Sequence, residues 1–276
     1  MKLIKPSFEI WNQPAGLEGV YKQIERVGRV CYKSEDKITE NSAKPFVDRM
    51  IKSGHGAMLE HGTVYLAMPI ETMLPIEANG WGKYTKNPYS EGFKAYKVDG
   101  QMRVAITTNL RVLVENGWMD DLKYICDPTE FHEKRITVHF TADAGVMREF
   151  FRHRVFSMAQ ESTRYCNYLR DKFSNSITVI YPSWLKEEEE LEFEEDMRVI
   201  EELYFKWLNK GWTAQQARVF LPLGVKAEAV MTGFTSDFKH FFDLRARGTT
   251  GAPHPQAKEL AEPLMKEFIA RKYINN

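Results

Sequence analysis

The sequence predicts an α+β fold, with strands early in the chain and helices dominant late. Alternating or continuous apolar runs predict strands at 61–69, 102–108, 135–141 and 176–182. Longer segments with apolar residues at helical spacing dominate after these strands. No internal repeat or low-complexity linker divides the 276 residues, so we expect one domain over 1–276.

Two helices are predicted before the first of these strands. Residues 17–32 carry apolar side chains at helical spacing. Residues 42–54 predict a second helix, with Ser42 as its N-cap, Pro45 in its first turn and Gly54 at its end.

The middle of the chain has a broken pattern. Glycine, aromatic and turn residues from 70 to about 103 predict a loop or an insertion. Residues 109–127 predict one or two short helices between two strands. Residues 142–154 predict a helix that begins at Asp143.

The last part of the chain is predicted to be helical. Residues 185–211 form a long amphipathic pattern that ends at Gly211, and their acidic run indicates a solvated helix face. Further helices are predicted at 215–234, 237–248 and 254–273.

Composition excludes several classes of protein. With 38 basic and 38 acidic residues, the chain lacks the basic excess of a nucleic-acid or membrane-surface binder. Cys31, Cys126 and Cys166 form no CxxC pair, so we expect neither a disulfide framework nor a metal site. Neither a signal-peptide core nor an apolar run of about 20 residues is present, which predicts a cytoplasmic protein.

One short stretch, "FRHRVFSMAQESTRY", concentrates positive charge among aromatic and polar residues. On a helix over 142–154, Arg152, His153 and Arg154 would spread around its C-terminal end, where cations complement the helix dipole. Ser162 and Arg164 suit a phosphate group, and Gln160 suits the edge of a planar ring. The residues alone leave an anion site and a salt-bridged structural cluster open, and they favour the anion site.

Within this stretch, "RHRVFSMAQES" has the form RHR, seven residues, Ser, which resembles the signature of flavin-dependent thymidylate synthases. Four other segments resemble that family in the same order: "GHGAMLEH", "ARVFLPLG", "FFDLRARG" and "HPQAKELA". The similarity covers most of residues 15–270. The stretch from about 70 to 135 is longer than compact members need, so we interpret it as an insertion.

The resemblance implies reductive methylation of dUMP to dTMP. Methylenetetrahydrofolate would donate the carbon, reduced FAD the hydride, and NADPH would reduce the flavin. No enzyme nucleophile would attack the uracil ring. The resemblance also implies a fold with a central antiparallel sheet and helices, and a homotetramer whose active sites are shared between subunits.

Individual roles follow from motif position. Arg245 would stabilise an ionised N3 of uracil, because a guanidinium keeps its proton while it stabilises an anion. The implied dUMP contacts are Glu149, Arg152, Gln160, Glu161, Ser162, Thr163, Arg164, Arg218 and Arg245, with Glu161 and Thr163 acting through their backbones. The implied FAD contacts are His55, Ala57, Arg152, His153, Arg154, Val155, Gln160, His240 and His254.

Several positions depart from the family pattern. Gln160 stands where the family has an acid, and Ala57 where it has a hydroxyl residue. Phe234 and Ser236 replace an Asn and an Arg on the flavin side, and His240 replaces an amide.

Alternatives to these assignments remain. Taken alone, His55 and His61 would be core or capping residues, but their place in the matched segment favours a flavin contact. His254 could be a turn residue. A nucleic-acid-binding module and a flavin- or nucleotide-binding homologue without catalysis are the competing functions. The neutral charge disfavours the first, and the departures at Phe234 and His240 favour the second.

Overall fold

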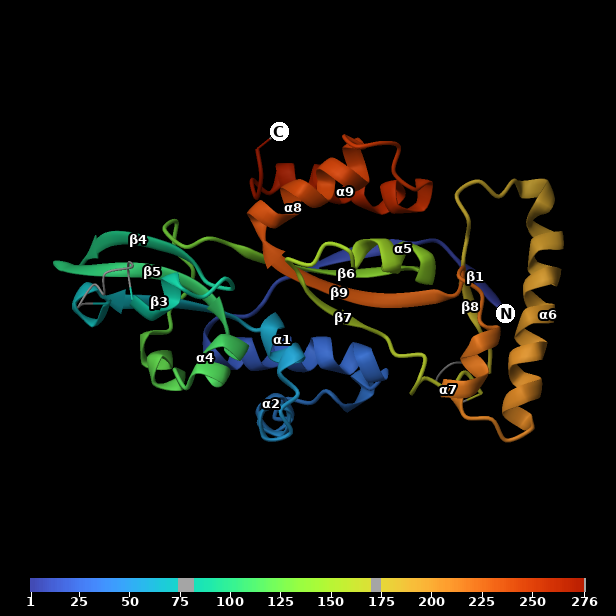
Figure 1. Cartoon of the computed structure of the whole chain (residues 1–276), viewed down its shortest axis with the longest axis horizontal. Helices are drawn as coiled ribbons and strands as arrows, with labels where there is room; N and C mark the ends of the chain where they lie inside the picture. The colour runs from blue at the N-terminus through green and yellow to red at the C-terminus, as the bar shows by residue number, and fades with distance from the viewer. Residues whose placement is uncertain (74–81, 170–174, 276) are drawn as a thin grey trace.

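The computed structural model describes residues 1–73, 82–169 and 175–275 and has a mixed α/β architecture with antiparallel sheets. Its central sheet has the strand order β2-β6-β9-β7, and every neighbouring pair is antiparallel (Figure 1). The strands are β2 (Ser7–Trp11), β6 (Arg135–Asp143), β7 (Ser157–Gln160) and β9 (Lys226–Phe234). The predicted α+β class with an antiparallel sheet is therefore confirmed.

Helices cover both faces of this sheet (Figure 1). One face packs against α5 (Ala144–Phe150), α8 (Thr235–Phe242) and α9 (Pro255–Ala270) around a core rich in phenylalanine. The other face packs against α1 (Gly16–Tyr32), through apolar residues of α1, β2, β7 and β9. Burial of these two apolar layers holds the sheet between the helices.

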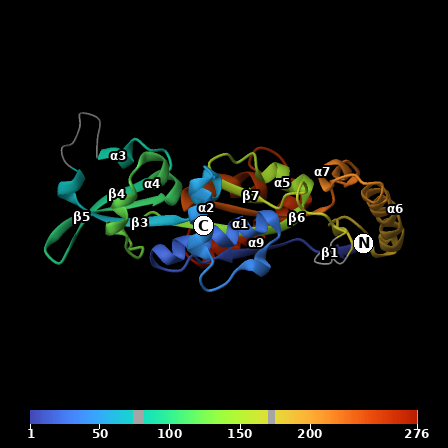
Figure 2. The same ribbon diagram turned by 90° about the horizontal axis from the view of Figure 1, so that it is seen from below.

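A second sheet, with the order β3-β5-β4, extends beyond one end of the first (Figures 1 and 2). Its strands are β3 (Thr63–Pro69), β4 (Glu91–Val98) and β5 (Gln101–Asn109), and all pairs are antiparallel. They share a core with α1, α2 (Ala43–Lys52) and α4 (Leu110–Asn116). The short helix α3 (Gly82–Thr85) precedes β4. The expected loop over 70–103 thus contains a strand, and whether 70–135 is an insertion stays a prediction.

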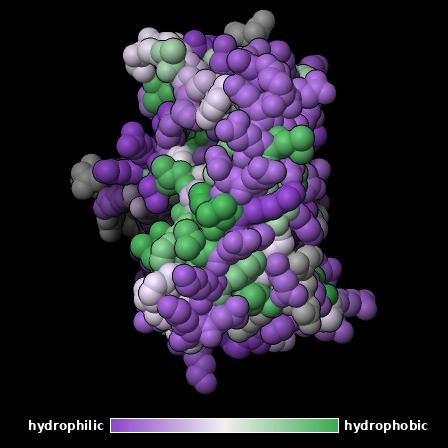
Figure 3. Space-filling model, turned by 90° about the vertical axis from the view of Figure 1, so that its right-hand side faces the viewer, coloured by the Kyte–Doolittle hydropathy of each residue, from purple (hydrophilic) through white to green (hydrophobic). Residues whose placement is uncertain are grey.

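The opposite end of the molecule carries a parallel pair, β1 (Lys2–Ile4) and β8 (Thr178–Ile180), beside α6 (Glu190–Asn209) and α7 (Ala214–Ala217). Figure 3 views this end and shows apolar side chains gathered among polar ones. Exposed apolar residues from this region are Trp184, Leu191, Val199, Leu203, Trp212, Val219 and Leu223. No helix in the described ranges is long and apolar enough to cross a membrane.

Most predicted elements are present. The helices predicted at 17–32, 42–54, 185–211 and 254–273 correspond to α1, α2, α6 and α9, and all four predicted strands form. The short strands β1, β2 and β7 were not predicted.

The helix predicted over 142–154 ends early, at Phe150. Asp143 caps its start as expected, because its Oδ1 accepts the backbone N–H of Val146 at 2.8 Å. After Phe150 the chain turns, and the N–H of His153 donates to the carbonyl of Phe150 at 3.0 Å. Arg152, His153 and Arg154 therefore lie on a turn that returns the chain to β7, and they do not spread around a helix.

The predicted helix over 215–234 is also wrong in its second half, where β9 forms. Ala227, Glu228, Ala229 and Met231 favour helices by intrinsic propensity. In the fold this segment pairs with β6 on one side and β7 on the other. Hydrogen bonds to two neighbouring strands override the local preference.

Candidate active site

Arg245 lies in the short π-helix Asp243–Arg247, directly after α8, and contacts two other predicted site residues. Its Nη1 donates to Oε2 of Glu149 at 2.5 Å, and its Nη2 donates to the backbone oxygen of Glu149 at 3.0 Å. Its Nε donates to Nε2 of His153 at 3.2 Å. The structure therefore brings these three residues together, and we call them the arginine cluster.

Aromatic packing positions the arginine cluster. Phe150, at the end of α5, packs edge-on against Phe241 of α8 with ring centroids 5.0 Å apart. The ring of His153 packs against the same Phe241 at 5.1 Å. Because α5 and α8 share this contact, Glu149 and Arg245 face each other from two different elements.

His153 is buried and neutral. Burial, followed by the charge of Arg245 and the neighbouring His240, lowers the pKa of His153 to about 4. Since Nε2 accepts a hydrogen bond from Arg245, the ring proton resides on Nδ1. His153 can therefore hold the guanidinium in place without adding a second positive charge.

A pocket of about 440 Å³ opens beside Glu149. Its apolar wall includes Trp184, Phe193 and Met197, and its polar groups include Asp143 and His254. The ring of His254 packs edge-on against Trp184 at 5.6 Å. His254 and Glu149 therefore line the same pocket.

A second group of predicted residues gathers after β7, in the loop of Ser162, Thr163 and Arg164; together with Arg218 we call it the phosphate cluster. Arg218 follows α7, and its Nη1 donates to Oγ1 of Thr163 at 3.5 Å. Nε of Arg164 donates to Gln215 at 2.9 Å. Both guanidinium groups are exposed, so two cations and two hydroxyl groups are available to a ligand at one surface.

Buried contacts anchor this loop from below. The side chain of Glu161 is 1% exposed and pairs with Nζ of Lys226 at 2.7 Å. The backbone N–H groups of Glu161 and Ser162 donate to the carbonyls of Glu228 and Cys31, at 2.8 Å and 3.0 Å. These two N–H groups serve the fold itself, and the exposed side chains remain for a ligand.

The two clusters lie on different faces of the central sheet. The arginine cluster joins α5 to the residues after α8, on one face, whereas the N–H of Ser162 bonds to Cys31 of α1, which covers the other face. β7 runs between His153 and Ser162 and ends at Gln160.

Several residues predicted to bind FAD lie at the surface, in or near a small pocket. Arg154 and Val155 are exposed and line a pocket of about 250 Å³, which we call the β9 pocket because it contains Gly233 and Phe234. Arg152 is exposed beside them, and His240 is exposed on α8, with its ring 5.8 Å from that of His153.

The segment before β3, residues 55–61, is exposed near its start and buried at its end. His55 and Ala57 are exposed, whereas His61 is fully buried. Nδ1 of His61 lies 2.8 Å from Oγ1 of Thr232, and burial followed by the charge of Arg135 lowers its pKa to about 3. His61 is therefore buried against Thr232 of β9, and its Nε2 has no hydrogen-bond partner among the described residues.

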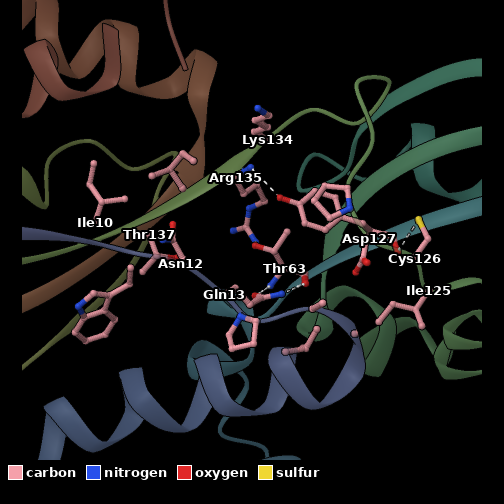
Figure 4. Close-up of a pocket in the computed structure, with 18 of the residues that line it drawn as sticks. Ile10, Asn12, Gln13, Thr63, Ile125, Cys126, Asp127, Lys134, Arg135 and Thr137 are labelled. Atoms are coloured by element: carbon pink, nitrogen blue, oxygen red, sulfur yellow. Dashed lines mark hydrogen bonds between the residues drawn. The ribbon is translucent and has the colours of Figure 1, made fainter. Parts of the chain in front are cut away.

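A further pocket, of about 330 Å³, lies between β2, the start of α1, β3 and β6 (Figure 4). Figure 4 labels Lys134 and Arg135 on one side of it and Cys126 and Asp127 on another. Arg135 lines both this pocket and the β9 pocket. No pattern in the sequence identified this position.

The model of the thymidylate synthase complementing protein family matches residues 101–271. This chain belongs to that family. The matched region contains the arginine cluster, the phosphate cluster and the β9 strand.

Individual relatives agree with this membership. The chain is 34% identical over 129 residues to the flavin-dependent thymidylate synthase of Pyrococcus furiosus, covering 46% of this chain and 50% of that protein. It is 26% identical over 154 residues to the probable flavin-dependent thymidylate synthase of Paramecium bursaria Chlorella virus 1, covering 50% and 69%. The chain thus spans about half the length of the Pyrococcus relative that it matches.

Among solved structures, the chain is similar to the UMP/dUMP methylase PolB from Streptomyces cacaoi. The identity is 16%, the TM-score is 0.45, and the alignment covers 98% of this chain and 93% of that one.

Two further residues of this family member were not identified from the sequence: Lys226, which anchors the loop under the phosphate cluster, and Arg135, which lines the β9 pocket. Burial opposes the charge of Lys226, but Glu161 and Glu228 outweigh it and raise its pKa. Arg135 donates to Ser157 at the start of β7. Lys226 meets Glu161 across 65 residues and Arg135 meets Ser157 across 22, so no local motif could have revealed either contact.

Proposed function

We propose that this chain is a flavin-dependent thymidylate synthase, a methyltransferase that converts dUMP to dTMP. Methylenetetrahydrofolate is the carbon donor and NADPH the reductant. The observation that carries the proposal is the arginine cluster, in which Arg245, Glu149 and His153 meet from two elements. Membership of the thymidylate synthase complementing protein family supports the same activity.

Arg245 is the catalytic residue in this account. Glu149 and His153 fix the orientation of its guanidinium, and its remaining Nη hydrogens are left for a ligand. Placed at N3 of uracil, the guanidinium stabilises the anion that develops there and makes C5 more nucleophilic. Because His153 is neutral, Arg245 supplies the positive charge of the arginine cluster, and Glu149 pairs with it.

The cysteines of the chain fit a reaction without an enzyme nucleophile. Burial raises the pKa of Cys31 and of Cys126 to about 11, and Cys166 is 1% exposed. Thiols with such pKa values stay protonated near neutral pH and are poor nucleophiles.

The phosphate cluster binds the 5′-phosphate of dUMP in this account, through Ser162, Arg164 and Arg218, with Gln160 and Thr163 nearby. Since the arginine cluster lies on the other side of the sheet, one nucleotide takes its phosphate contacts from one subunit and Arg245 from another. This arrangement requires an oligomer, and a homotetramer with shared active sites satisfies it.

One feature of the β9 pocket supports FAD binding there. Beside Arg154 and Val155, the buried Nε of Arg135 has no hydrogen-bond acceptor in the described part of the chain. Arg152, His153, Gln160, His55, Ala57, His240 and His254 would complete the FAD contacts. Reduced FAD supplies the hydride for the methyl group when it is bound.

Residues 1–276 form one domain with the fold of the flavin-dependent synthases, and the stretch 70–135 is an insertion in it. The enzyme works in the cytoplasm, without a metal ion, and binds neither nucleic acid nor membrane.

Growth of a thymidine-requiring cell that lacks its own synthase tests the function. Expression of this chain should restore growth without thymidine, and Arg245→Ala at equal expression should not. A well-expressed wild-type protein that fails to restore growth would favour a binding homologue without catalysis.

A further inference from the structure

Arg135 begins β6 and points across the end of the central sheet. Its Nη1 donates to the backbone oxygen of Glu60 at 3.0 Å and to Oγ1 of Thr63 at 3.3 Å. Its Nη2 donates to Oγ of Ser157 at 3.2 Å. All three acceptors are uncharged oxygens, so these bonds orient the guanidinium but do not neutralise it.

The charge of Arg135 has no direct counter-ion. None of the ion pairs formed by the described residues includes Arg135, and its buried Nε–H has no acceptor among them. Burial lowers the pKa of this guanidinium to about 10. The nearby carboxylates of Glu60, Asp237 and Glu91 oppose this shift but do not outweigh burial, so the position is suited to an anionic ligand.

The surroundings identify the side from which an anion would come. Arg135 faces Phe234 across the β6–β9 pair, and its guanidinium carbon lies 5.6 Å from that ring. Both residues line the β9 pocket, which also contains Arg154. Two guanidinium groups on one small pocket suit a group with two negative charges, because each can donate to its own set of phosphate oxygens.

Two acids line the same pocket, and neither takes the place of a counter-ion. Oδ2 of Asp237 accepts the backbone N–H of Phe234 at 3.1 Å and so caps α8. Burial raises the pKa of Asp237 and of Glu91, which makes both carboxylates easier to protonate beside an anion.

We propose that Arg135, together with Arg154, binds the diphosphate of a dinucleotide cofactor in the β9 pocket. The volume of about 250 Å³ suits part of such a cofactor and leaves its rings outside the pocket. The proposal rests on the proposed function in one respect, because FAD is the dinucleotide which that function requires. Arg135 is a binding residue here and takes no part in the chemical step.

FAD, FMN and riboflavin share one ring system but differ in their phosphate groups, so their affinities distinguish a phosphate contact from a ring contact. Affinities of the purified apoprotein for FAD, FMN and riboflavin are measured by quenching of flavin fluorescence, for wild type and Arg135→Met. The variant should bind FAD about 10- to 100-fold more weakly, the range expected for loss of a charged hydrogen bond, while its weak riboflavin binding stays unchanged. Lys134→Met, which removes the neighbouring exposed cation, should match wild type with all three ligands.

A protein that binds no flavin would contradict the proposed function but would leave the anion site at Arg135 untested. Inorganic pyrophosphate tests that site directly. Pyrophosphate should raise the melting temperature of wild type and of Lys134→Met but not of Arg135→Met. If Arg135→Met does not fold, Arg135→Gln replaces it, because glutamine can still form a hydrogen bond with Thr63 or Ser157. The same flavin affinities and melting temperatures are then measured. Equal FAD affinity in variant and wild type, or equal stabilisation of both by pyrophosphate, would overturn the proposal.

Discussion

Arg245 and His153 are joined by a single hydrogen bond in which Nε of the arginine donates to Nε2 of the histidine at 3.2 Å. The bond requires a lone pair on Nε2, so the imidazole is neutral whenever the bond is intact. This relationship couples the protonation of one residue of the RHR motif to the orientation of the residue that we assign to catalysis.

Arg245→Ala should lose most of the methylation activity and leave the binding of FAD intact. Loss of one group that stabilises a developing anion typically reduces kcat by about 100- to 1000-fold. Steady-state dTMP formation and the visible flavin spectrum measure the two properties. Arg247→Ala, whose partner Asp243 lies on the same π-helix, is the matched control and should keep most of the activity. Unchanged turnover in Arg245→Ala would remove this residue from the mechanism.

His153 should remain unprotonated down to about pH 5. Its pKa is lowered to about 4 in the fold, against an ordinary value of 6.5, so the unfolded chain binds the proton more readily between these values. Its contribution to stability is complete above pH 6.5 and is lost as the pH falls towards 4, with a slope of at most about 1.4 kcal/mol per pH unit. An NMR titration of the ring protons checks this directly, and a midpoint near 6.5 would refute the buried hydrogen bond.

Arg164→Met should raise the KM for dUMP while kcat changes little. Loss of a charge-assisted phosphate contact predicts an increase of about 10- to 100-fold. Arg218→Met should behave similarly, since it bonds the same loop through Thr163. Deoxyuridine, which has no phosphate, should bind wild type and both variants equally weakly. A selective fall in kcat would instead place these residues near the reacting ring.

Gly28→Ala should destabilise the protein without touching either cluster. A Cβ at this position in α1 would lie 2.5 Å from Cζ of Phe46, on α2. Overpacking of this kind costs about 1–3 kcal/mol, which exceeds the gain of about 1 kcal/mol from replacing glycine inside a helix. Denaturant unfolding measures the difference, with the exposed Lys22→Ala as a control on the same helix. A more stable Gly28→Ala protein would show that α1 and α2 pack less closely.

Long amphipathic elements could be predicted from the sequence because their pattern repeats over many residues. Helix α6 shows its polar face and its ending glycine directly, and α1 shows its apolar spacing. The strand β9 could not be recognised, since alanine, glutamate and methionine favour helices and only pairing with β6 and β7 makes the segment a strand. The early end of α5 had no glycine or proline to mark it.

The candidate site was predictable to a similar degree. Arg152–Arg154 are adjacent in sequence, and so are Ser162–Arg164, so the sequence alone could predict that the members of each group lie near one another. Contacts that join distant segments could not be predicted from the sequence. Arg245 meets His153 across 92 residues, and the Lys226–Glu161 pair under the phosphate cluster is held by burial that no local pattern records. The separation of the two clusters likewise depends on which side of the sheet each connection takes.

The most direct test of the account is the reaction itself with purified protein. Incubated with dUMP, methylenetetrahydrofolate, NADPH and FAD, the wild-type protein should form dTMP, measured by chromatography, and should form none when FAD is withheld. Protein that binds both FAD and dUMP but yields no dTMP in the complete mixture, or that forms dTMP equally well without FAD, would contradict it.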